Sequence, residues 1–244
     1  MFTLSASAYQ VLWERLALPQ MPMELMVLPR GIEEHERRAE IARGLEELRA
    51  NGLLESSELA SALWVLAHAE STVDGRLWNA RALTARASGR AVLGVLADDR
   101  ITVRWIDPGD LARAAVAVLP PLAAGMGQTV NVPSEVLGAA ARTAGASEWA
   151  LVDALSAAGV PSGDARRLGN MIRGRCNGAQ FGVTVASERG DRVVACFDTP
   201  AGRYLIEEQR GWTTVAPADA QRIGARVDQV LAEVVSRSHR GGSR

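Results

Sequence analysis

Lysine is absent from this 244-residue chain, so all 27 of its basic lysine-or-arginine positions are arginines. This absence excludes Schiff-base catalysis and phosphate-binding loops of the P-loop type, because both need a lysine amine. The formal net charge is −1, which leaves no overall positive field to attract nucleic acid or an anionic membrane. We therefore expect that the chain neither binds nucleic acid nor inserts into a membrane.

Cysteine and histidine are also scarce, with two and three copies respectively. Cys176 and Cys196 need not pair, and two unpaired thiols suit a reducing cytoplasm. His35 lies in "EEHERRAE", which lacks the second histidine of the HExxH zinc motif. Since no other spacing of cysteine, histidine and carboxylate side chains resembles a zinc site, we expect no metal and no cofactor.

The sequence contains no pattern typical of a signal peptide or a membrane span. The N-terminal "MFTLSASAYQVLWERL" lacks a basic region followed by a long apolar run. The apolar run at 112–127 is interrupted by Pro120 and Pro121, which leaves it too short to cross a bilayer. A cytoplasmic location is therefore expected, and the polar tail at 237–244 is predicted to be disordered.

Two successive rounds of helical and strand periodicity run along the sequence. In the first round, a short strand and several helices precede four strand-like segments between residues 70 and 106, and a helix follows Pro108. In the second, a strand at 128–132 and three helices precede four strands between 179 and 215, and a helix follows from Pro217. Because consecutive short strands form antiparallel meanders, the pattern predicts an α+β fold.

A local similarity between two segments, called the echo below, supports this repetition. The segments "WIDPGDLARA" and "TVAPADAQRI" align with Pro108 over Pro217, an offset of 217 − 108 = 109 residues. We interpret the echo as a duplicated α+β unit with quasi-twofold symmetry, forming a single domain over 1–236 with halves of about 1–120 and 128–236. Alternatively, the two segments are alike only because the first turns of helices share the same residue preferences.

The same alignment makes a prediction about the two closing helices. Each proline is expected to occupy the first helical position, where its missing N–H costs nothing. Asp107 would then cap the first helix, while Ala216 would leave the second helix without a side-chain cap.

No catalytic constellation is evident in the sequence, so the chain is not expected to be an enzyme. "GMGQTV" has two glycines and no third, which fails as a dinucleotide fingerprint, and no GxSxG nucleophile motif is present. Cys176 follows Arg173 and Arg175 but has no histidine beside it in the sequence. A small cytosolic enzyme that uses Cys176 or a carboxylate pair stays open as the alternative function.

One segment has the composition of a protein-recognition surface. "RRLGNMIRGRCNGAQFG" at 166–182 combines four arginines with Met171, a neighbouring isoleucine and Phe181 beside a predicted strand. A solvated helix end is an equally good explanation of the same residues. Trp78, next to a predicted strand turn, is a candidate exposed aromatic, whereas Trp13, Trp64 and Trp149 lie on helical stripes and are expected in the core.

Several segments of the sequence resemble those of a known family. The resemblance is carried by "GRAVLGVLADDRITVRWIDPGDLARAAVAVLPP" (89–121), "AQFGVTVAS" (179–187) and "DTPAGRYLIEEQRGWTTVAPADAQRIGARVDQVL" (198–231). These segments are similar to the EspG family, the cytosolic chaperones of type VII (ESX) secretion in actinobacteria. The resemblance implies a quasi-twofold fold with a central antiparallel sheet flanked by helical bundles.

The resemblance also implies a function and a surface. Family members bind secreted PE–PPE heterodimers at the helical tip of the PPE subunit and keep this apolar end soluble until export. They use the sheet, the second helical bundle and a loop between early strands, which corresponds here to the 166–182 region and the Trp78–Arg81 turn. The expected partner-binding residues are Met171, Arg173, Arg175, Gln180, Phe181, Phe197, Tyr204 and Trp78. A homodimer is possible as well.

Overall fold

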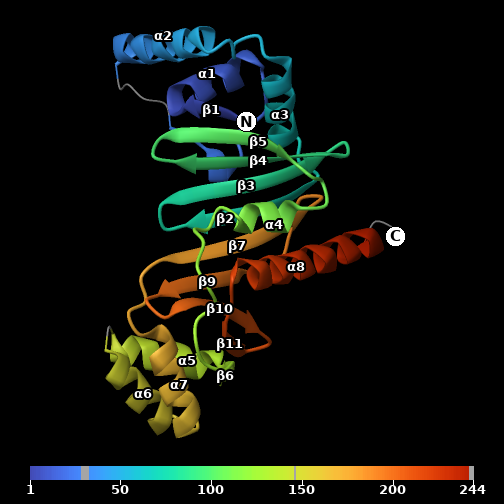
Figure 1. Cartoon of the computed structure of the whole chain (residues 1–244). Coiled ribbons are helices and arrows are strands. Elements are labelled where there is room, and N and C mark those ends of the chain that lie inside the picture. Colours follow the sequence, from blue (N-terminus) through green and yellow to red (C-terminus); the bar gives the residue numbers. More distant parts are fainter. Residues whose placement is uncertain (29–32, 146, 242–244) are drawn as a thin grey trace.

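A single eleven-stranded sheet runs the length of the computed structural model, which describes residues 1–28, 33–145 and 147–241 (Figure 1). Every pairing between neighbouring strands is antiparallel. The strands are β1 (Phe2–Ser5), β2 (Ser71–Leu77), β3 (Ala80–Ala87), β4 (Arg90–Ala97), β5 (Arg100–Ile106), β6 (Val130–Pro133), β7 (Gly178–Val185), β8 (Glu188–Arg189), β9 (Val194–Thr199), β10 (Gly202–Gln209) and β11 (Trp212–Pro217).

From the centre of the sheet outward, the two halves have the same relative strand order, apart from β8. The full order reads β1-β5-β4-β3-β2-β7-β9-β10-β11-β6, with the short β8 paired only to β7. The two halves of the chain meet at the central β2–β7 pair, in which Val73 lies opposite Val183. The predicted α+β fold with one antiparallel sheet is confirmed, and this order is the one expected of a quasi-twofold duplication. The exact limits of the two halves stay an interpretation.

The helices form two bundles and one central pair (Figure 1). One bundle lies at each end of the sheet, and α4 and α8 lie against its middle. The first bundle contains α1 (Ala6–Arg15), the 3-10 helix η1 (Met23–Leu25), α2 (Glu34–Ala50) and α3 (Ser57–Ala67); the second contains α5 (Ser134–Ala144), α6 (Glu148–Ala157) and α7 (Ser162–Ile172); the central pair is α4 (Leu111–Val116) and α8 (Ala220–Gly241).

Alternation along the strands shows which face each helical group covers, because successive side chains point to opposite faces. In β4, Val92 packs beneath the first bundle, whereas Leu93 packs beneath α4 and α8. In β10, Tyr204 packs beneath the second bundle and Leu205 beneath α4 and α8. Both bundles therefore cover the same face at its two ends, and the central pair covers the middle of the other face.

This arrangement leaves the middle of the bundle-side face uncovered. Along β2, Val73 and Leu77 belong to the core under α4 and α8, whereas Arg76 points the other way and is exposed. Along β7, Phe181 is buried in the same core while its neighbour Gln180 is exposed. We call the surface of β2, β7, β9 and β10 between the two bundles the open face.

The first closing helix starts later than the sequence predicted. Helix α4 begins at Leu111, after Asp110, so neither Pro108 nor Asp107 is at the helix start. The carboxylate of Asp107 instead accepts a hydrogen bond from the backbone N–H of Gly109 at 2.8 Å, within the turn that precedes the helix. The proline thus begins a turn, and the prediction that Asp107 caps α4 is wrong.

The second closing helix does have a side-chain cap. Pro217 is the last residue of β11, and α8 begins at Ala220. Asp219 Oδ1 accepts a hydrogen bond from the backbone N–H of Arg222 at 2.8 Å, which is the interaction of an N-cap aspartate. The expectation of an uncapped helix is therefore wrong, because the helix starts at the aspartate that follows the proline.

Helix α8 also extends into the predicted tail. It continues to Gly241, and Arg237 pairs with Asp191 at 3.2 Å. The prediction of disorder is therefore wrong for residues 237–241, where polar contacts such as that of Ser238 Oγ with Glu188 at 3.1 Å join the helix to the β7–β9 region. Residues 242–244 lie outside the part of the chain that the structure describes.

Candidate protein-docking surface

Four of the eight predicted binding residues lie in the core. Met171, Phe181, Phe197 and Tyr204 each expose 2 % or less of their surface. Phe181 is covered by α4 and α8. Met171 points from α7 into the core of the second bundle, and Phe197 and Tyr204 pack beneath that bundle, where their rings stack with centroids 5.5 Å apart. The prediction that these four contact a partner is corrected, because their side chains offer no surface.

The other four predicted residues are exposed, and three of them line one groove. Trp78, Arg175 and Gln180 surround a groove of about 550 Å³ on the open face, which we call the docking groove. Arg173 does not line it. Its Nε donates a hydrogen bond to Glu148 Oε2 at 3.0 Å, which joins the end of α7 to α6.

The floor of the docking groove is a single row of side chains across four strands. Arg76 of β2 lies opposite Gln180 of β7, Gln180 opposite Ala195 of β9, and Ala195 opposite Ile206 of β10. Such a row points to one face of the sheet, and neighbouring members lie within contact distance. Arg76, Ala195 and Ile206 were not among the residues predicted from the sequence, since strand alternation alone does not tell which face helices leave uncovered.

Arg175 is fixed at the wall of the docking groove by its surroundings. Its guanidinium carbon lies 5.1 Å from the ring centroid of Phe197, a cation–π arrangement. The next residue, Cys176, donates its backbone N–H to the carbonyl of Asp198 at 3.0 Å. Buried Phe197 therefore serves the surface indirectly, because it supports the arginine from below.

The charges in the docking groove are unpaired. Within the described chain, neither Arg76 nor Arg175 has a carboxylate partner, and Glu208 at the rim has no cationic partner. Many other arginines of this chain, such as Arg189 with Asp74, do form ion pairs. Free guanidinium groups on a surface with apolar Trp78 are suited to bind carbonyl and carboxylate oxygens of another protein.

A buried ion pair supports this part of the sheet. Arg203 is fully buried, and its Nε and Nη2 donate to the two carboxylate oxygens of Asp198 at 2.7 and 3.1 Å. Nη2 also donates to the carbonyl of Pro120 at 3.0 Å, which ties the β9–β10 hairpin to the segment joining the two halves. This pair was not predictable from the sequence, because "GRYLIEE" has the pattern of an ordinary strand.

Neither cysteine has the surroundings of a catalytic nucleophile. The exposed Cys176 directs its Sγ to the carbonyl of Asp198 at 3.3 Å. Burial raises the pKa of the Cys196 thiol to about 11, which disfavours its reactive thiolate. Over the described residues, no group of three or more histidine, cysteine, aspartate or glutamate side chains is placed to hold a metal ion.

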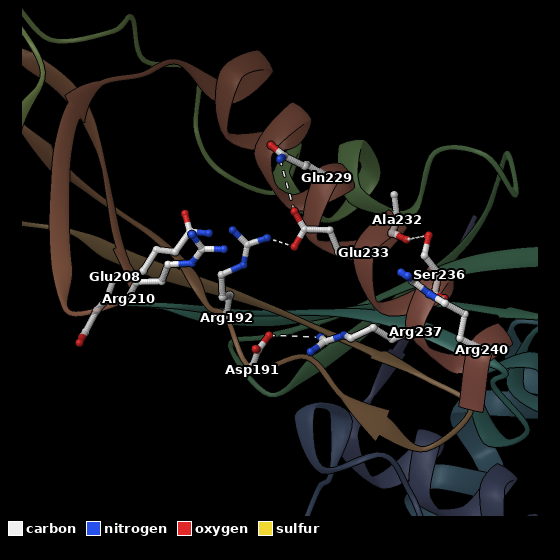
Figure 2. Close-up of a pocket in the computed structure, with 11 residues that line it drawn as sticks. Asp191, Arg192, Glu208, Arg210, Gln229, Ala232, Glu233, Ser236, Arg237 and Arg240 are labelled. Carbon is white, nitrogen blue, oxygen red and sulfur yellow. Dashed lines mark hydrogen bonds and ion pairs between the residues drawn. The ribbon is translucent and has the colours of Figure 1, made fainter. Parts of the chain in front are cut away.

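A second hollow, of about 720 Å³, lies where α8 meets the β8–β9 and β10–β11 connections (Figure 2). Figure 2 shows that ion pairs cross it: Arg192 pairs with Glu233, and Arg237 pairs with Asp191. These pairs attach the C-terminal half of α8 to the sheet. Most charged side chains of this second hollow therefore form ion pairs within the molecule, in contrast to those of the docking groove.

Two exposed tryptophans depart from the sequence expectation. Trp64 and Trp149 were expected in the core, yet 42 % and 75 % of their surfaces are exposed; Trp13 is buried as predicted. The reason for Trp64 is local, since its ring stacks on that of His68 at 4.6 Å on the outside of α3.

Among the helices that the structure describes, none combines the length and apolar character needed to cross a membrane.

Comparisons with known proteins identify relatives of this fold. A search of curated protein sequences finds no match. Among solved structures, the fold is similar to that of the Mycobacterium tuberculosis type VII secretion system chaperone EspG5 in complex with a PE25–PPE41 dimer, with a TM-score of 0.74. The sequence identity is 17 %, and the match covers 94 % of this chain and 95 % of that chain. The sequence model of the EspG family matches residues 5–229, and the chain therefore belongs to the EspG family.

Proposed function

We propose that this chain is a non-enzymatic chaperone of type VII secretion that binds a PE–PPE heterodimer in the cytoplasm and holds it soluble for export. Membership of the EspG family supports this role, as does the similarity of the fold to EspG5, whose structure contains a PE25–PPE41 dimer. The observation that carries the proposal is the docking groove, where Arg76, Arg175 and Trp78 are exposed together on the open face.

The chemistry of the docking groove suits the end of a helical hairpin. The last turn of a helix has carbonyl groups without intrahelical partners and carries partial negative charge. Arg76 and Arg175 can donate hydrogen bonds to such carbonyls or to nearby carboxylates. Trp78 and Ile206 can cover apolar side chains of the same end, which would otherwise expose a patch prone to aggregation.

Co-expression tests the proposal. PE–PPE heterodimers of the source genome are produced one pair at a time, with and without the chain, and the soluble fractions are analysed by size-exclusion chromatography with light scattering. We expect one pair to become soluble and to elute with the chain at the mass of a 1:1:1 complex. If no pair forms such a complex, and the chain elutes alone throughout, the proposed function is wrong.

The alternative of a cysteine enzyme is tested in the same preparations. If solubilisation of the PE–PPE pair depended on a catalytic thiol at Cys176, Cys176→Ser would lose this solubilising activity, although the serine hydroxyl is close in size to the thiol. On our proposal, the Cys176→Ser chain binds the same PE–PPE pair as the original chain.

A further inference from the structure

The segment between α1 and α2 exposes an unusual amount of apolar surface. Met23 is 70 % exposed and Leu28 is 79 % exposed, while Met26 and Val27 are half-buried. We call these four residues the methionine wall. Together with Trp78 they line a hollow of about 930 Å³ on the first-half side of the β2–β3 turn.

The backbone of the methionine wall is held firmly. Leu25 is fully buried and packs so closely on β4 that a Cβ added at Gly94 would lie 2.5 Å from its Cδ1. The Nη2 of Arg81 donates a hydrogen bond to the carbonyl of Met26 at 3.2 Å. Anchored in this way, the segment presents Met23 and Leu28 to solvent on a fixed support.

The methionine wall is continuous with the docking groove. Both hollows are lined by Arg76, Leu77 and Trp78, so the indole stands between them. On the first-half side the combined surface carries the apolar side chains of the methionine wall, with Arg81, Asp98 and Asp99 around the same hollow. The unpaired Arg175 lies on the other side, and the unpaired Arg76 lines both hollows. This division matches a helical end that is apolar on one side and exposes carbonyls on the other.

We infer that the methionine wall binds the apolar side chains of the PPE-subunit tip whose carbonyl end occupies the docking groove. The inference rests on the proposed function and adds a second contact area to it. Methionine side chains are flexible and polarisable, and they adapt to apolar partners of different shape. The wall thus contributes affinity for apolar surface, while the arginines across Trp78 orient the helix end.

A polar double variant tests the wall. In Met23→Gln with Leu28→Asn, both side chains keep roughly their size and lose their apolar character, and both are exposed, so the fold is retained. The matched control is Met126→Gln, since Met126 is 76 % exposed and lines neither hollow. Kd is measured by isothermal titration calorimetry with the PE–PPE heterodimer that the co-expression experiment identifies, and unfolding midpoints are measured for all variants.

We expect a Kd at least tenfold higher for the double variant, a change within twofold for Met126→Gln, and unchanged unfolding midpoints. A double variant that binds as tightly as the original chain overturns the inference but leaves the proposed function standing. A chain that is dimeric by light scattering and becomes monomeric in the double variant assigns the wall to a second copy and also overturns the inference. If the original chain binds no heterodimer at all, the proposed function fails, and the inference fails with it.

Discussion

The guanidinium group of Arg175 lies over the ring of Phe197, 5.1 Å from its centroid, at the wall of the docking groove. Phe197 is buried and stacks on Tyr204, so an exposed cation rests on the core beneath the second bundle. The contact explains how an arginine without an ion-pair partner can keep a defined position. It also separates two neighbours, because Arg173 is used within the molecule and Arg175 is not.

Substitution of Arg173 is expected to affect stability slightly and binding hardly at all. Its ion pair with Glu148 is well exposed, so solvent screening limits the loss in Arg173→Ala to roughly 0–1 kcal/mol. Urea unfolding measures this loss, and calorimetry with the PE–PPE heterodimer should give a Kd within twofold of the original. A tenfold rise in Kd would show that Arg173 contacts the partner after all.

Removal of Arg203 is expected to be strongly destabilising. In Arg203→Met the carboxylate of Asp198 stays buried without its cation, which costs about 3–5 kcal/mol. Urea unfolding followed by circular dichroism measures the loss, and the double change with Asp198→Leu should recover more than half of it because the stranded charge is gone. A loss below about 1 kcal/mol for Arg203→Met would contradict the assigned role of the pair.

Gly125 is expected to tolerate no side chain. A Cβ at this position would collide with the ring of Tyr204, whose hydroxyl donates to the carbonyl of Met126 at 2.9 Å. Gly125→Ala should therefore cost about 1–3 kcal/mol through overpacking. The matched control is Gly163→Ala in α7, where a Cβ meets no atom within 4 Å and where helix propensity favours alanine. Equal unfolding midpoints for the two variants would argue against the close packing of this segment.

The buried thiol of Cys196 is expected to contribute to stability in a pH-dependent way. Burial raises its pKa from the ordinary 9.0 to about 11, so between these values the unfolded chain loses the proton while the folded chain keeps it. The contribution is complete below pH 9 and is lost as the pH rises to 11. In Cys196→Ala this part of the alkaline decline in unfolding free energy should disappear. A thiol reagent at pH 8 should label exposed Cys176 quickly and Cys196 only after unfolding, and equal rates would contradict the burial.

Much of the fold follows from local sequence signals. The strands were predictable because period-two alternation is interrupted by clear turns, such as Asp98–Asp99, where both residues have positive φ. The starts of α4 and α8 were misplaced, because a proline before a helix fits a preceding turn as well as the first helical position. The capping aspartate, and not the proline, sets the beginning of α8.

The candidate site was only partly predictable, for a tertiary reason. Gln180 and Phe181 are adjacent in β7 and point to opposite faces, yet the sequence alone does not say that α4 and α8 cover the face of Phe181. Composition drew attention to Arg175, which lines the docking groove, but could not separate it from Arg173, which does not. Arg76 comes from a strand more than ninety residues earlier, and only the β2–β7 pairing brings it beside Gln180.

Charge reversal in the docking groove shows whether the PE–PPE partner binds there. The double variant Arg76→Glu with Arg175→Glu is compared with Arg49→Glu, which changes an arginine that is also exposed, at the end of α2. We expect the Kd for the PE–PPE heterodimer, measured by calorimetry, to rise at least tenfold in the double variant and to stay within twofold in the control. Equal affinity of the double variant and the original chain would contradict the placement of the partner in the docking groove.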